Sequence, residues 1–98
     1  MYRQGDILLV PVPEASAPAK TRPEPRDARG RLVLAYGEAT GHAHAIPGPG
    51  TLSHGFLHLP DGGRLEHEEH AAISLPKGWY RVVRQREYVP GSYRVVAD

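Results

Sequence analysis

The stretch PKGWYRVVRQREYV, Pro76–Val89, decides the fold class of this 98-residue chain. A Pro-Lys-Gly turn precedes a run in which aromatic and β-branched side chains are interspersed with arginines, the pattern of a strand with one buried face. It is the longest strand candidate in the sequence, and strand alternation places Arg84, Arg86 and Tyr88 on one face. The stretch therefore predicts a sheet rather than a helical bundle.

Shorter strand candidates fill much of the remaining chain. They are separated by turns rich in proline and glycine, of which the chain has 10 and 11, and this leaves little room for long helices. The candidates are DILLVPV at 6–12, RLVLAYGEA at 31–39, TGHAHAI at 40–46, TLSHGFLHL at 51–59 and SYRVVAD at 92–98. We expect an all-β fold, a small barrel or sandwich of short antiparallel strands.

One segment, 13–30, departs from the strand pattern. It reads PEASAPAKTRPEPRDARG and is rich in proline, alanine and alternating charge, so it can bury little surface. The sequence predicts a single domain spanning 1–98 with a long Pro-rich loop at 13–30. Such a loop is either a lid over a ligand or an insertion without a function of its own.

Composition and charge limit the classes of binding partner and the cellular compartments that we expect for this protein. A net charge of +1 argues against strong non-specific attraction to nucleic acid, although it leaves room for a local basic patch. The absence of cysteine excludes disulfides, thiolate nucleophiles and Cys-based zinc sites. No signal-peptide pattern opens the chain, and no apolar run approaches the ~20 residues that span a bilayer. We expect a cytoplasmic protein that does not bind membranes.

Two histidine-rich segments carry the candidate chemistry. In GEATGHAHAI, 37–46, His42 and His44 would share one face of a strand, where they could bind a metal, transfer protons or simply be exposed. In LEHEEHAAISL, 65–75, His67 and His70 are three residues apart. Only a helical turn or a bulge would bring this second pair together, and otherwise the segment is a charged, solvated turn.

The first chemical hypothesis is a metal site. His42, His44 and either His67 or His70, together with a carboxylate, could supply three or four ligands to zinc or another transition metal. A three-histidine site on a small barrel is similar to that of cupins. The cupin pattern, however, has a glutamate a few residues after its His-x-His, and this chain has AIPGPGTL at 45–52 instead.

The second hypothesis is phosphodiester cleavage without a metal. A histidine of near-neutral pKa can accept a proton from a ribose 2′-hydroxyl, and cationic donors can stabilise the phosphorane. The candidate phosphate contacts are Arg84, Arg86 and Lys77, because guanidinium and ammonium groups suit phosphate oxygens. Alternatively, the arginines form an exposed basic edge that keeps the sheet from aggregating.

The motifs taken together resemble a known group of proteins. QGDILLVPV, GEATGHAHAI, LEHEEHAAISLPKGWYRVVRQREY and YRVVAD cover nearly the whole chain outside the Pro-rich loop. In this order they resemble a family of small bacterial and phage proteins, which includes a class of type III CRISPR-associated ring nucleases. The Gly-Glu-x-Thr-Gly-His-x-His and His-Glu-Glu-His segments are its recognisable marks.

This resemblance implies an activity and a set of site residues. The protein would be a homodimeric, metal-independent ring nuclease without a cofactor, which cuts cyclic oligoadenylate or a similar RNA-like substrate by 2′-hydroxyl attack and so counters type III CRISPR signalling. The expected catalytic residues are His42, His44, His70 and His67. The expected substrate contacts are Arg84, Arg86, Lys77, Thr40 and either Tyr36 or Tyr88. The alternatives are a cupin-like metalloprotein and a non-catalytic module that binds a nucleotide or a protein.

Overall fold

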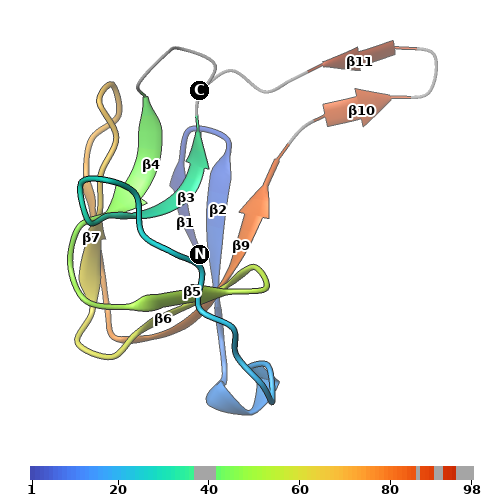
Figure 1. Cartoon of the computed structure of the whole chain (residues 1–98). Helices are drawn as coiled ribbons and strands as arrows, with labels where there is room; N and C mark the ends of the chain where they lie inside the picture. Colours follow the sequence, from blue (N-terminus) through green and yellow to red (C-terminus); the bar gives the residue numbers. More distant parts are fainter. Residues whose placement is uncertain (37–41, 86, 90–91, 95–98) are drawn as a thin grey trace.

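The fold is all-β, as the sequence predicts. The structure is a computed structural model that describes residues 1–36 and 42–85, and the backbone of 87–89 and 92–94. Its elements are short antiparallel strands (Figure 1). Within these described residues the only helical segment is η1, a 3-10 turn at Glu14–Ser16. No helix in this part of the chain is long and apolar enough to cross a membrane.

A five-stranded antiparallel sheet organises the molecule, with the order β1-β2-β9-β6-β5. Its strands are β1 (Tyr2–Gln4), β2 (Ile7–Val12), β9 (Gly78–Arg84), β6 (Phe56–Leu59) and β5 (Thr51–Ser53). β9 lies at the centre and pairs with β2 along its length, from Arg84 opposite Ile7 to Trp79 opposite Val12. Its other edge pairs with β6. The strand that decided the fold class from sequence is therefore the middle of the main sheet.

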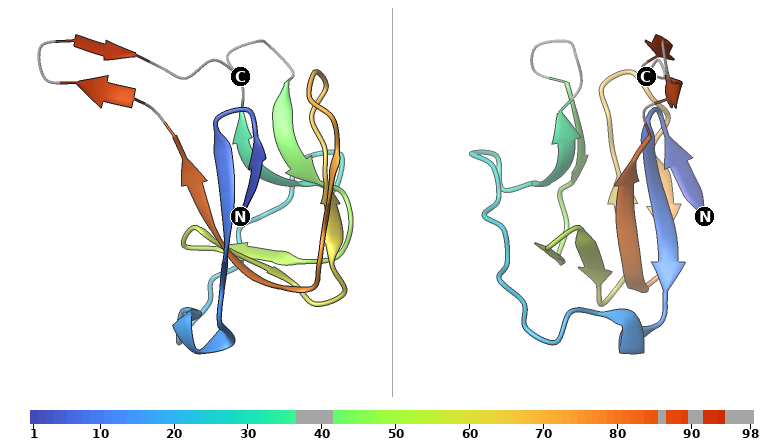
Figure 2. Two further views of the ribbon diagram at one scale, coloured as in Figure 1. Left: turned by 180° about the vertical axis from the view of Figure 1, so that it is seen from behind. Right: turned by 90° about the vertical axis from the view of Figure 1, so that its right-hand side faces the viewer.

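Two further strand pairs lie beside the main sheet. β3 (Leu32–Tyr36) pairs with β4 (Ala43–Ile46), and β7 (Gly63–Leu65) pairs with β8 (Ile73–Leu75). An isolated bridge joins the hairpins, because the backbone groups of Ala45 and Glu66 exchange two hydrogen bonds of 2.9 and 2.8 Å. The second view in Figure 2 shows β3 and β4 facing the five-stranded sheet.

The hydrophobic core lies between these hairpins and the main sheet. Strand alternation supplies it: in β6, Leu57 and Leu59 are fully buried while Phe56 and His58 are only partly covered. Gly50 lets the backbone approach this core closely, because a Cβ there would lie 2.8 Å from Leu59 Cδ2. The core consists of Ile7, Leu9, Leu32, Ile46, Leu52, Leu57, Leu59, Leu65, Leu75 and Tyr80.

Part of the Pro-rich segment 13–30 is tied to the main sheet. The amide of Arg22 donates to Ser53 Oγ at 2.9 Å, and the amide of Glu24 donates to the Leu52 carbonyl at 2.8 Å. The Arg26 guanidinium donates to the carbonyl of Gly48 at 2.8 Å. These bonds fix residues 22–26 beside β5, which favours the insertion alternative over a lid for this part of the segment.

For two of the predicted strands the boundaries were wrong. The predicted strand 79–89 is interrupted: β9 ends at Arg84, and the amide of Gln85 adds one last hydrogen bond in the β2–β9 register by donating to the Asp6 carbonyl at 2.7 Å. The chain resumes as the hairpin of β10 (Glu87–Val89) and β11 (Ser92–Arg94). The segment 51–59 is two strands joined at His54 and Gly55, whose φ of 51° and 77° fit a two-residue hairpin turn rather than a bulge.

Glycine substitutions test the turn between β6 and β7. Gly62 and Gly30 both have left-handed φ, 77° and 78°, but a Cβ on Gly62 would lie 2.7 Å from the Leu75 carbonyl oxygen, whereas one on Gly30 would meet nothing within 4 Å. We expect Gly30→Ala to lower the free energy of unfolding by about 1 kcal/mol and Gly62→Ala by at least about 1 kcal/mol more. Urea denaturation measures both. Equal losses would contradict the close approach at Gly62.

Candidate histidine site

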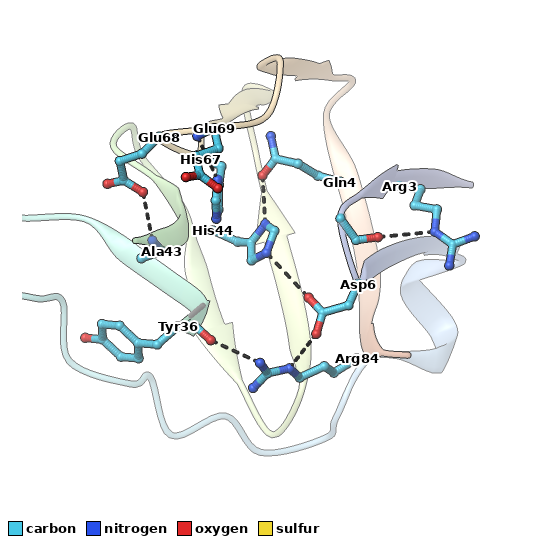
Figure 3. A network of polar contacts seen from close by, with 11 residues as sticks. Arg3, Gln4, Asp6, Tyr36, Ala43, His44, His67, Glu68, Glu69 and Arg84 are labelled. Carbon is cyan, nitrogen blue, oxygen red and sulfur yellow. Dashed lines mark hydrogen bonds and ion pairs between the residues drawn. The ribbon is translucent and has the colours of Figure 1, made fainter. Parts of the chain in front are cut away.

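His44 is the buried centre of the site. It lies in β4 with no exposed surface, and its Nδ1 is 2.9 Å from Gln4 Oε1 (Figure 3). The Gln4 side-chain amide donates to the carbonyls of Leu65 at 3.1 Å and Ala71 at 3.0 Å, which fixes its orientation. Because Gln4 Oε1 can only accept, His44 Nδ1 carries the proton and Nε2 is the nitrogen that exchanges one.

The Nε2 side of His44 faces a buried carboxylate. His44 Nε2 lies 3.5 Å from Asp6 Oδ1, and Asp6 is only 1% exposed. Asp6 Oδ2 accepts a hydrogen bond from Arg84 Nε at 2.8 Å, while Arg84 Nη2 donates to the Tyr36 carbonyl at 3.1 Å. Arg84 is thus engaged in stabilising Asp6, a role different from the phosphate contact expected from the sequence.

The two histidine-rich segments meet at this centre. His67 belongs to the bend between β7 and β8, and its ring centroid lies 4.4 Å from that of His44 and 5.7 Å from that of His42. His70, in the same bend, lies 4.5 Å from His67 and 5.8 Å from His44. The bend brings His67 and His70 together as their three-residue spacing required. We call these residues, His42, His44, His67 and His70, the histidine cluster.

Burial and neighbouring positive charge keep His44 neutral. Loss of solvation is the largest effect and lowers its pKa from 6.5 to about 4, and the nearby His67 lowers the pKa further. The carboxylate of Asp6 acts in the opposite direction but does not outweigh burial. His44 therefore serves as a fixed packing and hydrogen-bonding element at neutral pH rather than as a proton carrier at the surface.

The hydrogen bonding of His67 does not suit ligation of a metal through its Nε2. The Glu69 amide donates to His67 Nδ1 at 3.0 Å, so neutral His67 carries its proton on Nε2. Ligation through Nε2 would need the opposite tautomer, with Nδ1 as the donor. Nε2 of His44, His67 and His70 is buried without a hydrogen-bond partner, yet among the described residues no three His, Asp or Glu side chains are placed to hold a metal ion.

His42 is the member of the cluster that reaches solvent. Its side chain is 25% exposed, and its Nδ1 lies 3.7 Å from Glu69 Oε1. The next residue, Ala43, donates its amide to Glu68 Oε1 at 2.9 Å, and this hydrogen bond is the main reason why the pKa of Glu68 is lowered. Glu68 is consequently ionised at neutral pH, and the exposed edge of the cluster combines an imidazole with carboxylates.

A shallow pocket of about 210 Å³ opens beside this edge. Two arginines contribute to it, Arg29 from the end of the Pro-rich segment and Arg31 just after it, and sequence reasoning missed both. Arg31 forms an ion pair with Asp27 at 2.8 Å and lies 3.9 Å from Glu68. The guanidinium of Arg29 has no ion pair with any described residue. The pocket is lined by Arg29, Arg31, Ala43, Glu66, His67 and Glu68.

The other predicted substrate contacts are scattered. Tyr36 ends β3 near Arg84, and its side chain is 62% exposed. Lys77 lines a different pocket together with Trp79. The predictions for Thr40 and Arg86, and that for the Tyr88 side chain, fall outside the described residues.

The comparisons with known proteins give a family but no activity. Residues 3–85 match the model of a domain of unknown function, DUF8820. The chain belongs to the DUF8820 family. Searches of curated proteins and of solved structures return no significant match. The DUF8820 span runs from β1 to just past the end of β9, so it contains the whole histidine cluster, Arg29 and the Asp6–Arg84 pair.

The buried His44 makes a prediction about pH and stability. As pH falls from 6.5 toward 4, the unfolded chain takes up a proton on His44 while the folded protein does not, so the free energy of unfolding decreases. We expect a loss of about 2 kcal/mol from this group between pH 7.5 and pH 5. Urea denaturation at both pH values measures it.

Two variants isolate the contribution of His44. His44→Gln should flatten this part of the pH dependence even if the variant is less stable at every pH. His54→Asn is the matched control, because His54 is exposed in a turn with positive φ that asparagine tolerates. A pH dependence that is identical in wild type and His44→Gln would show that His44 titrates normally.

Proposed function

We propose that this DUF8820 protein is a metal-independent phosphodiesterase that opens cyclic oligoadenylate rings. The observation that supports it is the contact between the partly exposed His42 and His67, because His67 lines the pocket that also bears Arg29 and Arg31. A proton acceptor beside guanidinium groups is the minimum that intramolecular cleavage of a phosphodiester requires. The resemblance of the two histidine segments to ring nucleases suggests the substrate.

In the proposed reaction His42 accepts the proton of a ribose 2′-hydroxyl. The 2′-oxygen forms a bond to phosphorus, the bond from phosphorus to the 5′-oxygen breaks, and the proton is finally delivered to that leaving oxygen. The products are a linear strand with a 2′,3′-cyclic phosphate and a free 5′-hydroxyl. The transfer is balanced without water or a metal ion as reactant. Glu69, 3.7 Å from His42 Nδ1, orients the imidazole.

The arginines of the pocket have separate roles in this proposal. Arg29 is exposed and has no ion pair among the described side chains, so it is available to a phosphate oxygen. Arg31 is held by Asp27 through its Nε and Nη2 atoms, which fixes the pocket wall. Glu68 is a carboxylate beside Arg31, and it would repel a phosphate placed deep in the pocket. In this proposal the substrate phosphate therefore binds beside Arg29.

The buried residues support the reactive ones from behind. His44 contacts the His67 ring and is itself fixed by Gln4, so it positions the bend that carries His67, Glu68 and Glu69. It has no exposed surface and would not touch a substrate. The predicted roles of His44 and His70 in proton transfer are thus replaced, in this proposal, by positioning roles.

The proposal also includes an oligomeric state and a biological role for the protein. Cyclic oligoadenylate has rotational symmetry, and two copies of a shallow site related by a two-fold axis would cradle it better than one copy. We propose a homodimer acting in the cytoplasm, where it would counter type III CRISPR signalling. A non-catalytic nucleotide-binding module is the alternative, and it predicts binding without a product.

The first test is turnover of cyclic tetra- and hexa-adenylate with and without excess EDTA. We expect linear products ending in a cyclic phosphate in both conditions. His42→Gln should lower kcat by roughly 10²-fold or more while leaving the melting temperature unchanged, because general base catalysis contributes roughly 10²- to 10⁴-fold. His54→Asn should retain full activity. Intact rings with the wild-type protein in every condition, or full activity in His42→Gln, would refute this mechanism.

The second test concerns the phosphate contact. Arg29→Gln should raise KM roughly tenfold, the effect expected from losing a hydrogen bond between charged groups, with a smaller change in kcat. Arg81→Gln is the control, because Arg81 is an exposed arginine of β9 outside the pocket. Steady-state kinetics of both variants decide the point. Equal KM values for the two variants would remove Arg29 from substrate binding.

A further inference from the structure

A pair of stacked aromatic rings lies on the face of the main sheet that is turned away from the core. Tyr80 points into the core and is 2% exposed, so Trp79, its neighbour on β9, points to the opposite face. Trp79 lies directly opposite His58 of β6, and the two ring planes are 10° apart with centroids separated by 4.3 Å. On its other side Trp79 lies opposite Val12 of β2.

The spacing of the strands defines how these rings stand. Neighbouring strands are about 4.8 Å apart, so parallel rings stacked at 4.3 Å across two strands must stand upright on the sheet. His58 then covers one face of the Trp79 indole. The other face is turned toward the strand of Val12, whose side chain is too small to cover an indole ring.

A pocket of about 340 Å³ lies at this position. Val12, Pro60, Trp79 and His58 form its aromatic and apolar part. Two charged residues of opposite sign also line it: Glu14 from η1 and Lys77 from the turn before β9. Gly78 adds to the open space, because a Cβ on it would meet no atom within 4 Å.

We propose that this pocket binds a nucleoside monophosphate, with the base stacked on Trp79 and the phosphate held by Lys77. The size of the pocket lies at the lower end of the range for small-molecule sites. A planar base would extend the existing stack of His58 and Trp79 as a third ring, an arrangement favourable for any base. The Lys77 ammonium provides a point charge for phosphate, and the Glu14 carboxylate can accept from an exocyclic amino group. Adenine carries such a group.

This site is separate from the histidine cluster. Trp79 and Arg84 lie at opposite ends of β9, about 17 Å apart at ~3.3 Å per residue, and Arg84 is the end that contacts Asp6 and the cluster. The inference does not depend on the proposed phosphodiesterase activity. It predicts that His42→Gln binds AMP as tightly as the wild-type protein does.

The experiment uses the intrinsic fluorescence of Trp79, the one tryptophan of the chain. Titration with AMP should quench the emission and saturate, because a stacked base contacts the indole directly. Ribose 5-phosphate, which has no base, should leave the emission unchanged. Lys77→Gln should weaken AMP binding roughly tenfold through the loss of one charge-assisted contact. Lys20→Gln is the matched control, since Lys20 is exposed in the Pro-rich segment and is the only other lysine.

The outcomes separate this proposal from the catalytic one. Absence of saturable quenching by AMP at millimolar concentration would overturn the proposal, as would equal quenching by ribose 5-phosphate. Equal AMP affinity in Lys77→Gln and Lys20→Gln would overturn the assignment of the phosphate contact. Because AMP is not a cyclic substrate, loss of ring cleavage in His42→Gln with normal AMP quenching would support two independent sites.

Discussion

The arrangement of the histidine cluster and of the strands around it depends on one carboxylate that is buried between strands. Asp6 occupies the two-residue turn between β1 and β2 and is 1% exposed. An ionised carboxylate at such a depth is strongly destabilising unless it is paired and hydrogen-bonded. Arg84 supplies the charge, and the Asp6 carbonyl accepts from the Gln85 amide. Because the Arg84 side chain is 34% exposed, its removal costs less than the loss of a partner from a fully buried ion pair.

This pairing joins the end of the central strand to the turn between β1 and β2. At the last residue of β9, the Arg84 side chain reaches Asp6 while remaining 34% exposed. The next backbone amide, of Gln85, bonds the Asp6 carbonyl in the same register as the β2–β9 ladder. The same turn presents Asp6 to His44 and, through Gln4, the neighbouring strand orients the His44 ring. One buried charge therefore organises three strands and the inner half of the histidine cluster.

The sequence allowed the elements to be predicted better than the contacts between them. The strand signals in 79–84 and in 6–12 are local, and each segment forms a strand at that place. The proximity of His67 and His70 followed from their spacing, given a bend between β7 and β8, but the meeting of this pair with His42 and His44 depends on the fold. Gln4 and Asp6 could not be found in this way, because their roles arise from side chains 40 and 78 residues away. Asp6 carries one local signal: it follows glycine in a tight turn and precedes a fully apolar strand.

The predicted long strand is interrupted after Arg84, and Arg84 has a role other than the one predicted from the sequence. Alternation placed Arg84 and Arg86 on one exposed face, as a phosphate-binding strip. In the folded chain Arg84 pairs with the buried Asp6 while its own side chain is 34% exposed, and the matched DUF8820 span ends at Gln85, before Arg86 and Tyr88. The cationic groups beside the cluster come instead from Arg29, at the end of the segment predicted as a loop, and from Arg31, at the start of the next predicted strand. With a net charge of +1, the chain can attract a phosphate only through such local groupings, and the fold creates them by tying the Pro-rich segment back to the sheet.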